Sequence, residues 1–301
     1  KYSHTAKCRL NPEQSYVVNS IIEDYDSQKR ETYLLKGVTG SGKTEVYLEI
    51  IEHVLSMDKQ VIMLIPEIAL TYQTVMRFYR RFGGVVSILN SRMSKGERYD
   101  QYLRAKRGEI KIMIGPRSAL FTPFDKLGLI VIDEEHEGAY KSDSVPKYHA
   151  RETAIELAAM CNASVLLGSA TPSVDAYYKA QRGEYKLFVL NNRAGESILP
   201  EIETVDLREE LKCGNKSIFS RLKKLMDERL ANKEQIMLFL NRRGYVGFIN
   251  CRECGHVIKC PHCDIALTAH NNGRLVCHYC GYSEPDKKLC PKCGSKYIGC
   301  Q

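Results

Sequence analysis

The sequence lacks an uninterrupted apolar run long enough to cross a membrane, and its first residues lack the basic and then apolar layout of a secretory signal. The first absence excludes a helical membrane span, and together they lead us to expect a cytoplasmic protein with no membrane partner. The chain also lacks low-complexity tracts, and its 44% hydrophobic and 27% charged residues are typical of a globular protein. Because it begins at Lys1 rather than Met, we expect a segment of a longer protein.

Cysteine, in contrast, is plentiful: the chain has 12, and eight of them form four C-x-x-C pairs between Cys251 and Cys293. This spacing is typical of tetrahedral zinc sites rather than of a secreted disulfide framework, which favours a reducing compartment. Two such pairs complete a closed Cys₄ site, so we predict two structural Zn²⁺ ions. Spacing alone leaves several pairings open. The predicted ligands are Cys251, Cys254, Cys260, Cys263, Cys277, Cys280, Cys290 and Cys293.

The other cysteines and the nearby histidines are predicted to be ordinary residues. Any histidine of this region could replace a thiolate, but eight thiolates already saturate two sites. A region of about fifty residues with so few apolar groups could hardly fold without metal. The histidines are His256, His262, His270 and His278, and the other cysteines, expected to be reduced, are Cys8, Cys161, Cys213 and Cys300.

The net charge is weak support for a nucleic-acid partner. The formal value of +8 counts every thiol as neutral. Two zinc ions held by eight thiolates would lower it to about +4. An ordinary, mildly basic surface explains that value equally well.

Five short apolar runs alternate with longer amphipathic stretches between about residues 11 and 190. Because buried parallel strands read as short apolar runs, this pattern predicts a doubly wound α/β domain around a parallel sheet. The predicted strands are TYLLKG at 32–37, VIMLIP at 61–66, IKIMIG at 110–115, LGLIVID at 127–133 and ASVLLGSAT at 163–171.

The sequence after this domain indicates a linker and a second unit. Residues 191–215 show no sustained periodicity and contain Gly and Pro. We expect a helix over 217–231, capped by Ser217 or Ser220, and then a strand over 234–244 that begins a second α/β unit. The predicted divisions are a first lobe at 1–190, a linker at 191–215, the start of a second lobe at 216–250 and a zinc-binding module at 251–301.

The stretch GVTGSGKT fits the pattern G-x-x-x-x-G-K-[ST] and stands between a predicted strand and a predicted helix. In this pattern the glycines let backbone N–H groups converge on phosphate oxygens at a helix N-terminus. Lys43 would reach the β and γ phosphates, and the Thr44 hydroxyl would ligate Mg²⁺. A glycine-rich turn without a ligand is the alternative. The predicted phosphate-binding residues are Gly37, Thr39, Gly40, Ser41, Gly42, Lys43 and Thr44.

Two carboxylates lie at the end of the predicted strand LGLIVID: Asp133 is its last residue, and Glu134 follows directly. At the carboxyl edge of a parallel sheet, Asp133 would lie beside the phosphate loop and hold Mg²⁺, and Glu134 would orient or deprotonate the attacking water. A solvated strand end is the alternative for an acidic cluster in isolation. The acidic pair and the phosphate loop together predict hydrolysis of ATP, with Lys43, Asp133 and Glu134 as the catalytic residues.

The blocks DEEH at 133–136 and GSAT at 168–171 resemble motifs II and III of superfamily 2 helicases. Longer blocks in the same order resemble the PriA family of bacterial replication-restart helicases (primosomal protein N′) over nearly the whole chain. The resemblance implies a RecA-like first lobe, the start of a second RecA-like lobe and a zinc-binding module. The similar blocks are NPEQ at 11–14, LIPEIALTYQ at 64–73, GPRSALFTPF at 115–124, DEEHEGAYKSDSVPKYHAR at 133–151, FLNRRGY at 239–245 and the cysteine array.

This resemblance implies roles for further residues. Gln14 would recognise adenine, Thr71 and Arg117 would face the DNA backbone, and Ser169 and Thr171 would link hydrolysis to lobe movement. A loop that resembles an aromatic-rich coupling segment would stack on unpaired bases. Two alternatives stay open: LIPEIAL could be only a strand and its turn, and the rings could pack against their own domain. The coupling residues would be Tyr140, Lys141, Tyr148, His149 and Arg151.

The resemblance also implies a nested zinc arrangement, in which the two outer C-x-x-C pairs hold one ion and the two inner pairs hold the other. The family has a DNA-binding region before the ATPase and motifs V and VI after the zinc module, and neither is found in this sequence. Motif VI carries an arginine that stabilises the transferring phosphoryl group. We therefore expect the chain to bind nucleotide and to hydrolyse it poorly.

The leading hypothesis is an ATP-driven 3′→5′ DNA helicase that reopens stalled or branched forks for primosome assembly. By resemblance, its partners would be single-stranded and forked DNA, primosome proteins and single-stranded DNA-binding protein. One alternative is a zinc-ribbon primosome scaffold with a nucleotide-binding switch and little helicase activity. A nucleotide kinase with a zinc lid is a third hypothesis, which DEEH followed by GSATPS disfavours.

Overall fold

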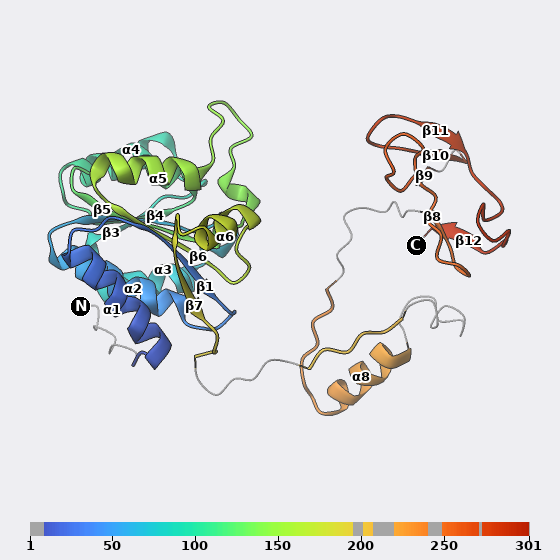
Figure 1. The fold of residues 1–301 in the computed structure, drawn as a ribbon, viewed down its shortest axis with the longest axis horizontal. Coiled ribbons are helices and arrows are strands. Elements are labelled where there is room, and N and C mark those ends of the chain that lie inside the picture. The colour runs from blue at the N-terminus through green and yellow to red at the C-terminus, as the bar shows by residue number, and fades with distance from the viewer. Residues whose placement is uncertain (1–8, 195–200, 207–219, 240–248, 271–272, 301) are drawn as a thin grey trace. The chain divides into compact units, whose positions relative to one another are not determined.

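A computed structural model describes residues 9–194, 201–206, 220–239, 249–270 and 273–300 (Figure 1). The chain divides into two compact units, Lys1–Leu199 and Pro200–Gln301. Among the described residues, no helix has both the length and the apolar character that a membrane crossing requires. Cys8, Cys213, Ser217 and most of the block at 239–245 lie outside the described residues.

The first unit is built on a seven-stranded sheet whose neighbouring strands all run parallel, in the order β3-β4-β2-β5-β6-β1-β7. This confirms the predicted doubly wound α/β architecture, and all five predicted strands are present. The strands are β1 (Thr32–Gly37), β2 (Gln60–Leu64), β3 (Val86–Ile88), β4 (Ile112–Gly115), β5 (Leu127–Asp133), β6 (Ser164–Ser169) and β7 (Lys186–Leu190).

Three helices cover each face of the sheet (Figure 1). On one face lie α1 (Pro12–Asp26), α2 (Lys43–Ser56) and α3 (Tyr72–Phe82), and their apolar side chains form one core with the strands. The second core packs the other face beneath α4 (Lys95–Lys106), α5 (Ala150–Cys161) and α6 (Val174–Gln181). Alanines fill much of the α5 and α6 contact, so these helices approach the sheet closely.

Two strands were not predicted, and both are edge strands. β3 has only three residues, which is too short for a periodicity to be recognised. β7 begins with the exposed Lys186 and alternates between exposed and buried positions, as an edge strand with a partly solvated face does. The interior strands were predicted because burial on both faces makes them uniformly apolar.

The register of three neighbouring strands aligns their carboxyl ends. Asp133 at the end of β5 pairs with Gly168 of β6, and Ser169 at the end of β6 pairs with Lys36 near the end of β1. The segments that follow these strands therefore leave the sheet side by side along one edge.

The second unit contains α8 (Ser220–Ala231) and a set of short strands. The helix confirms the described part, residues 220–231, of the helix predicted over 217–231. The strand predicted over 234–244 is wrong for its described part, because residues 234–239 are irregular, with Met237 and Phe239 largely exposed. A strand needs a hydrogen-bonded partner, and none of the described residues supplies one.

The zinc-binding region forms two small antiparallel sheets. One joins β9 (Thr268–His270), β10 (Arg274–Val276) and β11 (Ser283–Pro285). The other pairs β8 (Ile249–Cys251) with β12 (Ile298–Cys300), so the first and last strands of the region are neighbours. Among its described residues, the apolar core has six buried members, of which two are cysteines.

We predict that Gly168→Ala lowers the free energy of unfolding by about 1–3 kcal/mol, because the added methyl group would overlap the Tyr47 side chain in a closed core. Chemical denaturation of the two proteins measures the change. Gly84→Ala is the control, because a methyl group there meets nothing within 4 Å, and its effect should stay within about 0.5 kcal/mol. Equal effects at the two positions would contradict the close approach.

Candidate nucleotide and zinc sites

The phosphate loop connects β1 to the start of α2 at the carboxyl edge of the sheet. Gly40 and Gly42 both have φ near +80°, a conformation that favours glycine, and Gly42 is the N-cap of α2. The Ser41 amide donates to the Val38 carbonyl at 2.9 Å and closes the turn. The Lys43 ammonium group donates to the Gly37 carbonyl at 3.0 Å, so the lysine lies across its own loop.

The loop has the features of an anion cradle. The Ser41 hydroxyl is buried and has no hydrogen-bond partner among the residues that the structure describes, which leaves a donor for an incoming oxygen. A methyl group added at Gly42 would overlap the Gln14 amide, so the backbone here must remain bare. The N-terminus of α2 adds its positive dipole end. The residues present therefore fit the phosphate groups of a nucleotide.

Gln14 lies against this loop, as expected for a residue that would contact the nucleotide. Its Nε2 donates to the Ser41 carbonyl at 2.8 Å, and its Oε1 accepts from the Asn11 amide at 2.9 Å. The second bond belongs to a capping box at the start of α1. The cap therefore fixes the glutamine side chain beside the phosphate loop.

Asp133 ends β5 at the same edge of the sheet. Burial and the neighbouring Glu134 raise the pKa of its carboxyl group above the usual range, whereas the charge of Lys43 lowers it. Such a carboxylate gains from a nearby cation, because a cation favours its ionised form. Glu134 follows with φ +48°, which turns the chain sharply away from the strand.

Two tyrosines hold Asp133: Tyr47, which the sequence analysis did not single out, and Tyr140, which it assigned to the coupling loop. Tyr47 of α2 donates its hydroxyl to the Asp133 carboxylate at 3.0 Å, and Tyr140 donates to the Asp133 carbonyl at 2.6 Å. Both rings are almost completely buried. Burial and Asp133 raise the pKa of Tyr47 well above its usual range, so its hydroxyl remains a donor. Tyr140 therefore packs within its own domain, the alternative left open for this loop.

Arg151 is also buried rather than available to a base. It donates to the Glu135 carboxylate at 2.9 Å and to the Ser173 hydroxyl at 2.6 Å. Glu135 in turn accepts from the Ser173 amide at 2.6 Å, and Ser173 caps α6. This network ties the end of β5 to the segment after β6.

A second contact joins the same two segments. The His136 ring and the Ser169 hydroxyl are 2.7 Å apart, and Ser169 accepts from the Thr171 amide at 3.0 Å. Ser169 is fully buried. The DEEH and GSAT blocks, which lie far apart in the sequence, are therefore in direct contact: His136 contacts Ser169, and the Glu135 amide donates to the Gly168 carbonyl at 3.0 Å.

The remaining residues of the predicted coupling loop lie on a short hairpin-like segment. Lys141 and His149 form an isolated β-bridge, and Ser142 donates to the Tyr148 carbonyl at 2.8 Å. The Tyr148 ring packs edge-on against Phe121 at 5.3 Å. His149 caps α5, and Lys141 is exposed. The Lys141 side chain is therefore open to solvent, whereas the Tyr148 ring already packs against a residue of its own domain.

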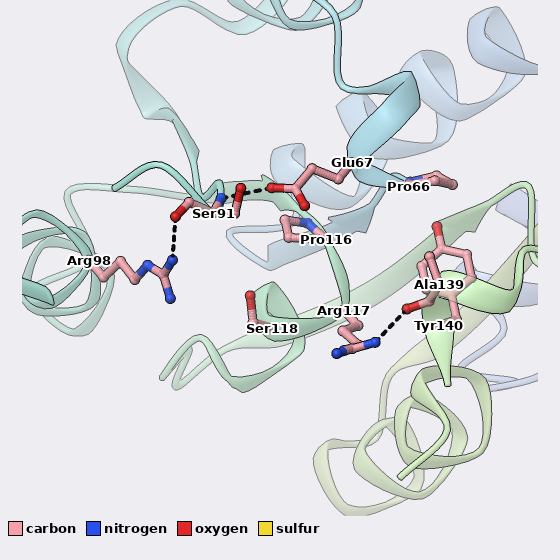
Figure 2. A pocket seen from close by; sticks show the side chains of 9 residues that line it. All are labelled: Pro66, Glu67, Ser91, Arg98, Pro116, Arg117, Ser118, Ala139 and Tyr140. Atoms are coloured by element: carbon pink, nitrogen blue, oxygen red, sulfur yellow. Dashed lines mark hydrogen bonds between the residues drawn. The ribbon is translucent and has the colours of Figure 1, made fainter. Parts of the chain in front are cut away.

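A pocket of about 290 Å³ lies where the segments after β2 and β4 leave the sheet (Figure 2). Arg117 lines it and donates to the carbonyls of Ala139 and Lys141, at 3.0 and 2.8 Å, which connects the pocket to the coupling loop. Arg98 lines it from α4 and donates to the Ser91 carbonyl at 3.1 Å. Thr71 is exposed and caps α3, where its hydroxyl accepts from the Thr74 amide.

The eight paired cysteines form two clusters, and within each the sulfur atoms lie within 4.8 Å of one another. This confirms the nested arrangement, since the outer and inner pairs separate as expected. Closed sets of four thiolates are structural zinc sites. The outer cluster is Cys251, Cys254, Cys290 and Cys293, and the inner cluster is Cys260, Cys263, Cys277 and Cys280.

The pKa of the first cysteine is lowered in three of the four knuckles, at Cys251, Cys277 and Cys290, whereas burial raises the pKa of Cys260. Backbone hydrogen bonds from the knuckle lower the pKa of Cys251 to about 6 and that of Cys277 to about 7. Backbone donors favour the ionised form because they stabilise its charge. Among the other described cysteines, Cys161 lies on α5 and forms no disulfide.

Two family models match the sequence. One, described as "Type III restriction enzyme, res subunit", matches residues 7–174. The other, described as "PriA DNA helicase Cys-rich region (CRR) domain", matches residues 260–285, which contain the inner cluster.

Curated relatives extend the match along the chain. The Replication restart protein PriA of Bacillus subtilis is 48% identical over 299 residues, which cover 99% of this chain and 37% of the relative. The same protein of Chlamydia muridarum is 45% identical, with 94% and 38% covered. Among solved structures, the helicase MrfA aligns with a TM-score of 0.52 and 19% identity, covering 78% of this chain and 36% of MrfA. At that identity the alignment supports the fold alone.

The first model covers more than half of the chain, and with the fold and phosphate loop it defines a member of the Type III restriction enzyme res subunit class of P-loop domains. The chain belongs, within this class, to the PriA family of replication restart proteins. It spans little more than a third of the length of these relatives, 37% of the first and 38% of the second.

We predict that the purified chain retains two tightly held zinc ions and that Cys260→Ser retains one, because a three-thiolate site loses a strong ligand. Metal analysis after gel filtration measures the ratio. Cys161→Ser should keep both ions, because Cys161 belongs to neither cluster. Retention of two ions by Cys260→Ser would contradict the assignment.

Proposed function

We propose that the chain forms the nucleotide-binding lobe and zinc module of an ATP-dependent 3′→5′ DNA helicase that restarts replication at stalled or branched forks. The carrying observation is that the phosphate-loop helix and Asp133 meet through the Tyr47 hydroxyl at one sheet edge. Family membership supports the biological role. In this proposal residues 1–190 are the first lobe, 191–215 a linker, 216–250 the start of the second lobe and 251–301 the zinc module.

The proposed chemistry assigns a role to each group at the edge. Thr44 and Asp133 would hold Mg²⁺, which neutralises charge on the β and γ phosphates when it is bound. Lys43 binds the same phosphates, and Glu134 orients or deprotonates the attacking water. Gln14 contacts the adenine. The raised pKa of Asp133 is consistent with a cation ligand.

We propose that single-stranded and forked DNA is held near the pocket lined by Arg98 and Arg117 (Figure 2). Guanidinium groups and the Thr71 hydroxyl suit phosphate contact without sequence preference. Arg117 also bonds the coupling loop, so DNA bound there would act on the segment that holds Tyr140 and Arg151. A structure of MrfA, which shares this fold, is described as bound to DNA and AMPPNP.

The proposal extends to the primosome. Primosome proteins and single-stranded DNA-binding protein would be partners, and the zinc module would be a rigid contact surface for them. The alternative, a zinc scaffold with a nucleotide switch, predicts nucleotide binding without hydrolysis. The next experiment distinguishes the two hypotheses.

We predict DNA-stimulated ATP hydrolysis and unwinding by a protein of the relatives' length that contains these residues, because both nucleotide and DNA sites would then act together. ATPase assays with and without forked DNA measure the stimulation. Lys43→Ala should reduce ATP affinity by about tenfold or more, since it removes a charge-assisted phosphate contact. Lys106→Ala, at the exposed end of α4, is the matched control and should leave the ATP affinity and the DNA-stimulated hydrolysis unchanged.

Nucleotide binding without hydrolysis, under DNA concentrations that saturate binding, would favour the switch hypothesis and contradict the motor. Hydrolysis that ignores DNA would contradict the coupling of the two sites.

We also predict that Tyr47→Phe raises the Mg²⁺ concentration needed for half-maximal ATP binding several-fold, with little change in metal-free nucleotide affinity. The Tyr47 hydroxyl donates a hydrogen bond to one oxygen of the Asp133 carboxylate. Without this bond the oxygen loses its donor, and the carboxylate can rotate. Titration of Mg²⁺ at fixed ATP analogue measures the effect.

Tyr33→Phe is the matched control, because it removes another buried hydroxyl that donates to a carboxylate, Asp24, at 3.3 Å. It should lower stability to a similar degree and leave the Mg²⁺ dependence unchanged. A shift of equal size in both variants would mean that Tyr47 acts only through stability.

A further inference from the structure

His270 and His278 face each other on the zinc-binding region and belong to neither cysteine cluster. Their Nε2 atoms are 3.2 Å apart, and their ring centroids are 5.1 Å apart. His278 is exposed and His270 is partly exposed, so solvent reaches the pair. In the described part of the chain, neither ring forms an ion pair with a carboxylate.

Backbone hydrogen bonds hold the segments that carry both histidines, a strand end at His270 and a turn at His278. His270 ends β9 opposite Arg274 of β10, and its carbonyl accepts from the Gly273 amide at 3.1 Å. His278 lies inside the knuckle between Cys277 and Cys280, which the Gly281 amide closes on the Cys277 carbonyl at 2.9 Å. Bound zinc in the inner cluster would fix this knuckle further. The two rings are therefore preorganised with respect to each other.

We propose that this pair binds a third metal ion, a borderline divalent cation such as Zn²⁺. Imidazole nitrogen is a preferred ligand for such ions. Two zinc–nitrogen bonds of about 2.0–2.1 Å that meet at a tetrahedral angle place the nitrogens about 3.3 Å apart, and a right angle places them about 2.9 Å apart. The observed 3.2 Å lies between these values, close to the tetrahedral one.

The site differs from the two cysteine clusters because it is open. Among the residues that the structure describes, no third cysteine, histidine or carboxylate atom completes a group with the two rings. A four-coordinate ion would keep two positions for water or for a donor from another molecule. With two neutral ligands in place of four thiolates, this ion exchanges readily while the structural ions stay bound.

A direct N–H···N bond between two neutral rings is the competing explanation for the short separation. It also brings the nitrogens together, but it does not create binding for an added ion. Added metal therefore decides between the two.

The test is equilibrium dialysis of the chain, with its two structural zinc ions in place, against free Zn²⁺ up to about 0.1 mM. The wild-type chain should bind a third equivalent, and His270→Gln and His278→Gln should each lose it. His262→Gln is the matched control, because His262 also lies in a knuckle of the inner cluster and packs on Tyr282 instead. It should retain the third equivalent.

A wild-type chain that stays at two equivalents overturns the site, and so does a third equivalent that persists in the His270→Gln variant. The number of tightly held ions is measured in parallel, because His278 is next to a cysteine ligand and its replacement can disturb the inner cluster. His270 lies outside the knuckles, so the His270→Gln result decides if the His278→Gln variant loses structural zinc.

Discussion

The register of β5, β6 and β1 is the constraint on which the candidate nucleotide site depends. Parallel pairing of Asp133 with Gly168 and of Ser169 with Lys36 brings three segments to one edge, although the sequence separates them widely. A shift by one residue would turn each inward side chain to the opposite face. The contacts of Tyr47 with Asp133 and of His136 with Ser169 require this alignment. The helices on both faces stabilise it by burying the strands.

The fold of the zinc-binding region is stabilised by a different interaction. Its six-residue core is too small to offset the chain entropy of about fifty ordered residues. Metal coordination supplies the missing free energy, and backbone donors favour the thiolate form of Cys251 and Cys277 in their knuckles. The first unit is therefore held by apolar packing and the zinc-binding region by metal–sulfur bonds.

Interior strands, the phosphate loop and the cysteine pairs could be predicted because each is recorded locally in the sequence. Tyr47 was missed because the sequence alone does not distinguish a tyrosine of the hydrophobic core from one that binds a carboxylate. Only the hydrogen bond from its hydroxyl to Asp133 shows that it positions this residue. Arg151 was read as a cation for DNA, but its partners, Glu135 and Ser173, are distant in sequence. The strand expected over 234–244 is absent from its described part, residues 234–239, because an apolar run favours a strand only where a pairing partner is present.

The pairing of β8 with β12 means that the chain enters and leaves the zinc-binding region through adjacent strands. Paired strands lie only about 5 Å apart, so the region closes on itself and needs little from its surroundings to join its ends. Segments of this kind can be inserted into, or removed from, a loop of another fold without separating the flanking elements. The region thus has the topology of an insertion module, which a surrounding fold could gain or lose without a break between its own flanking elements.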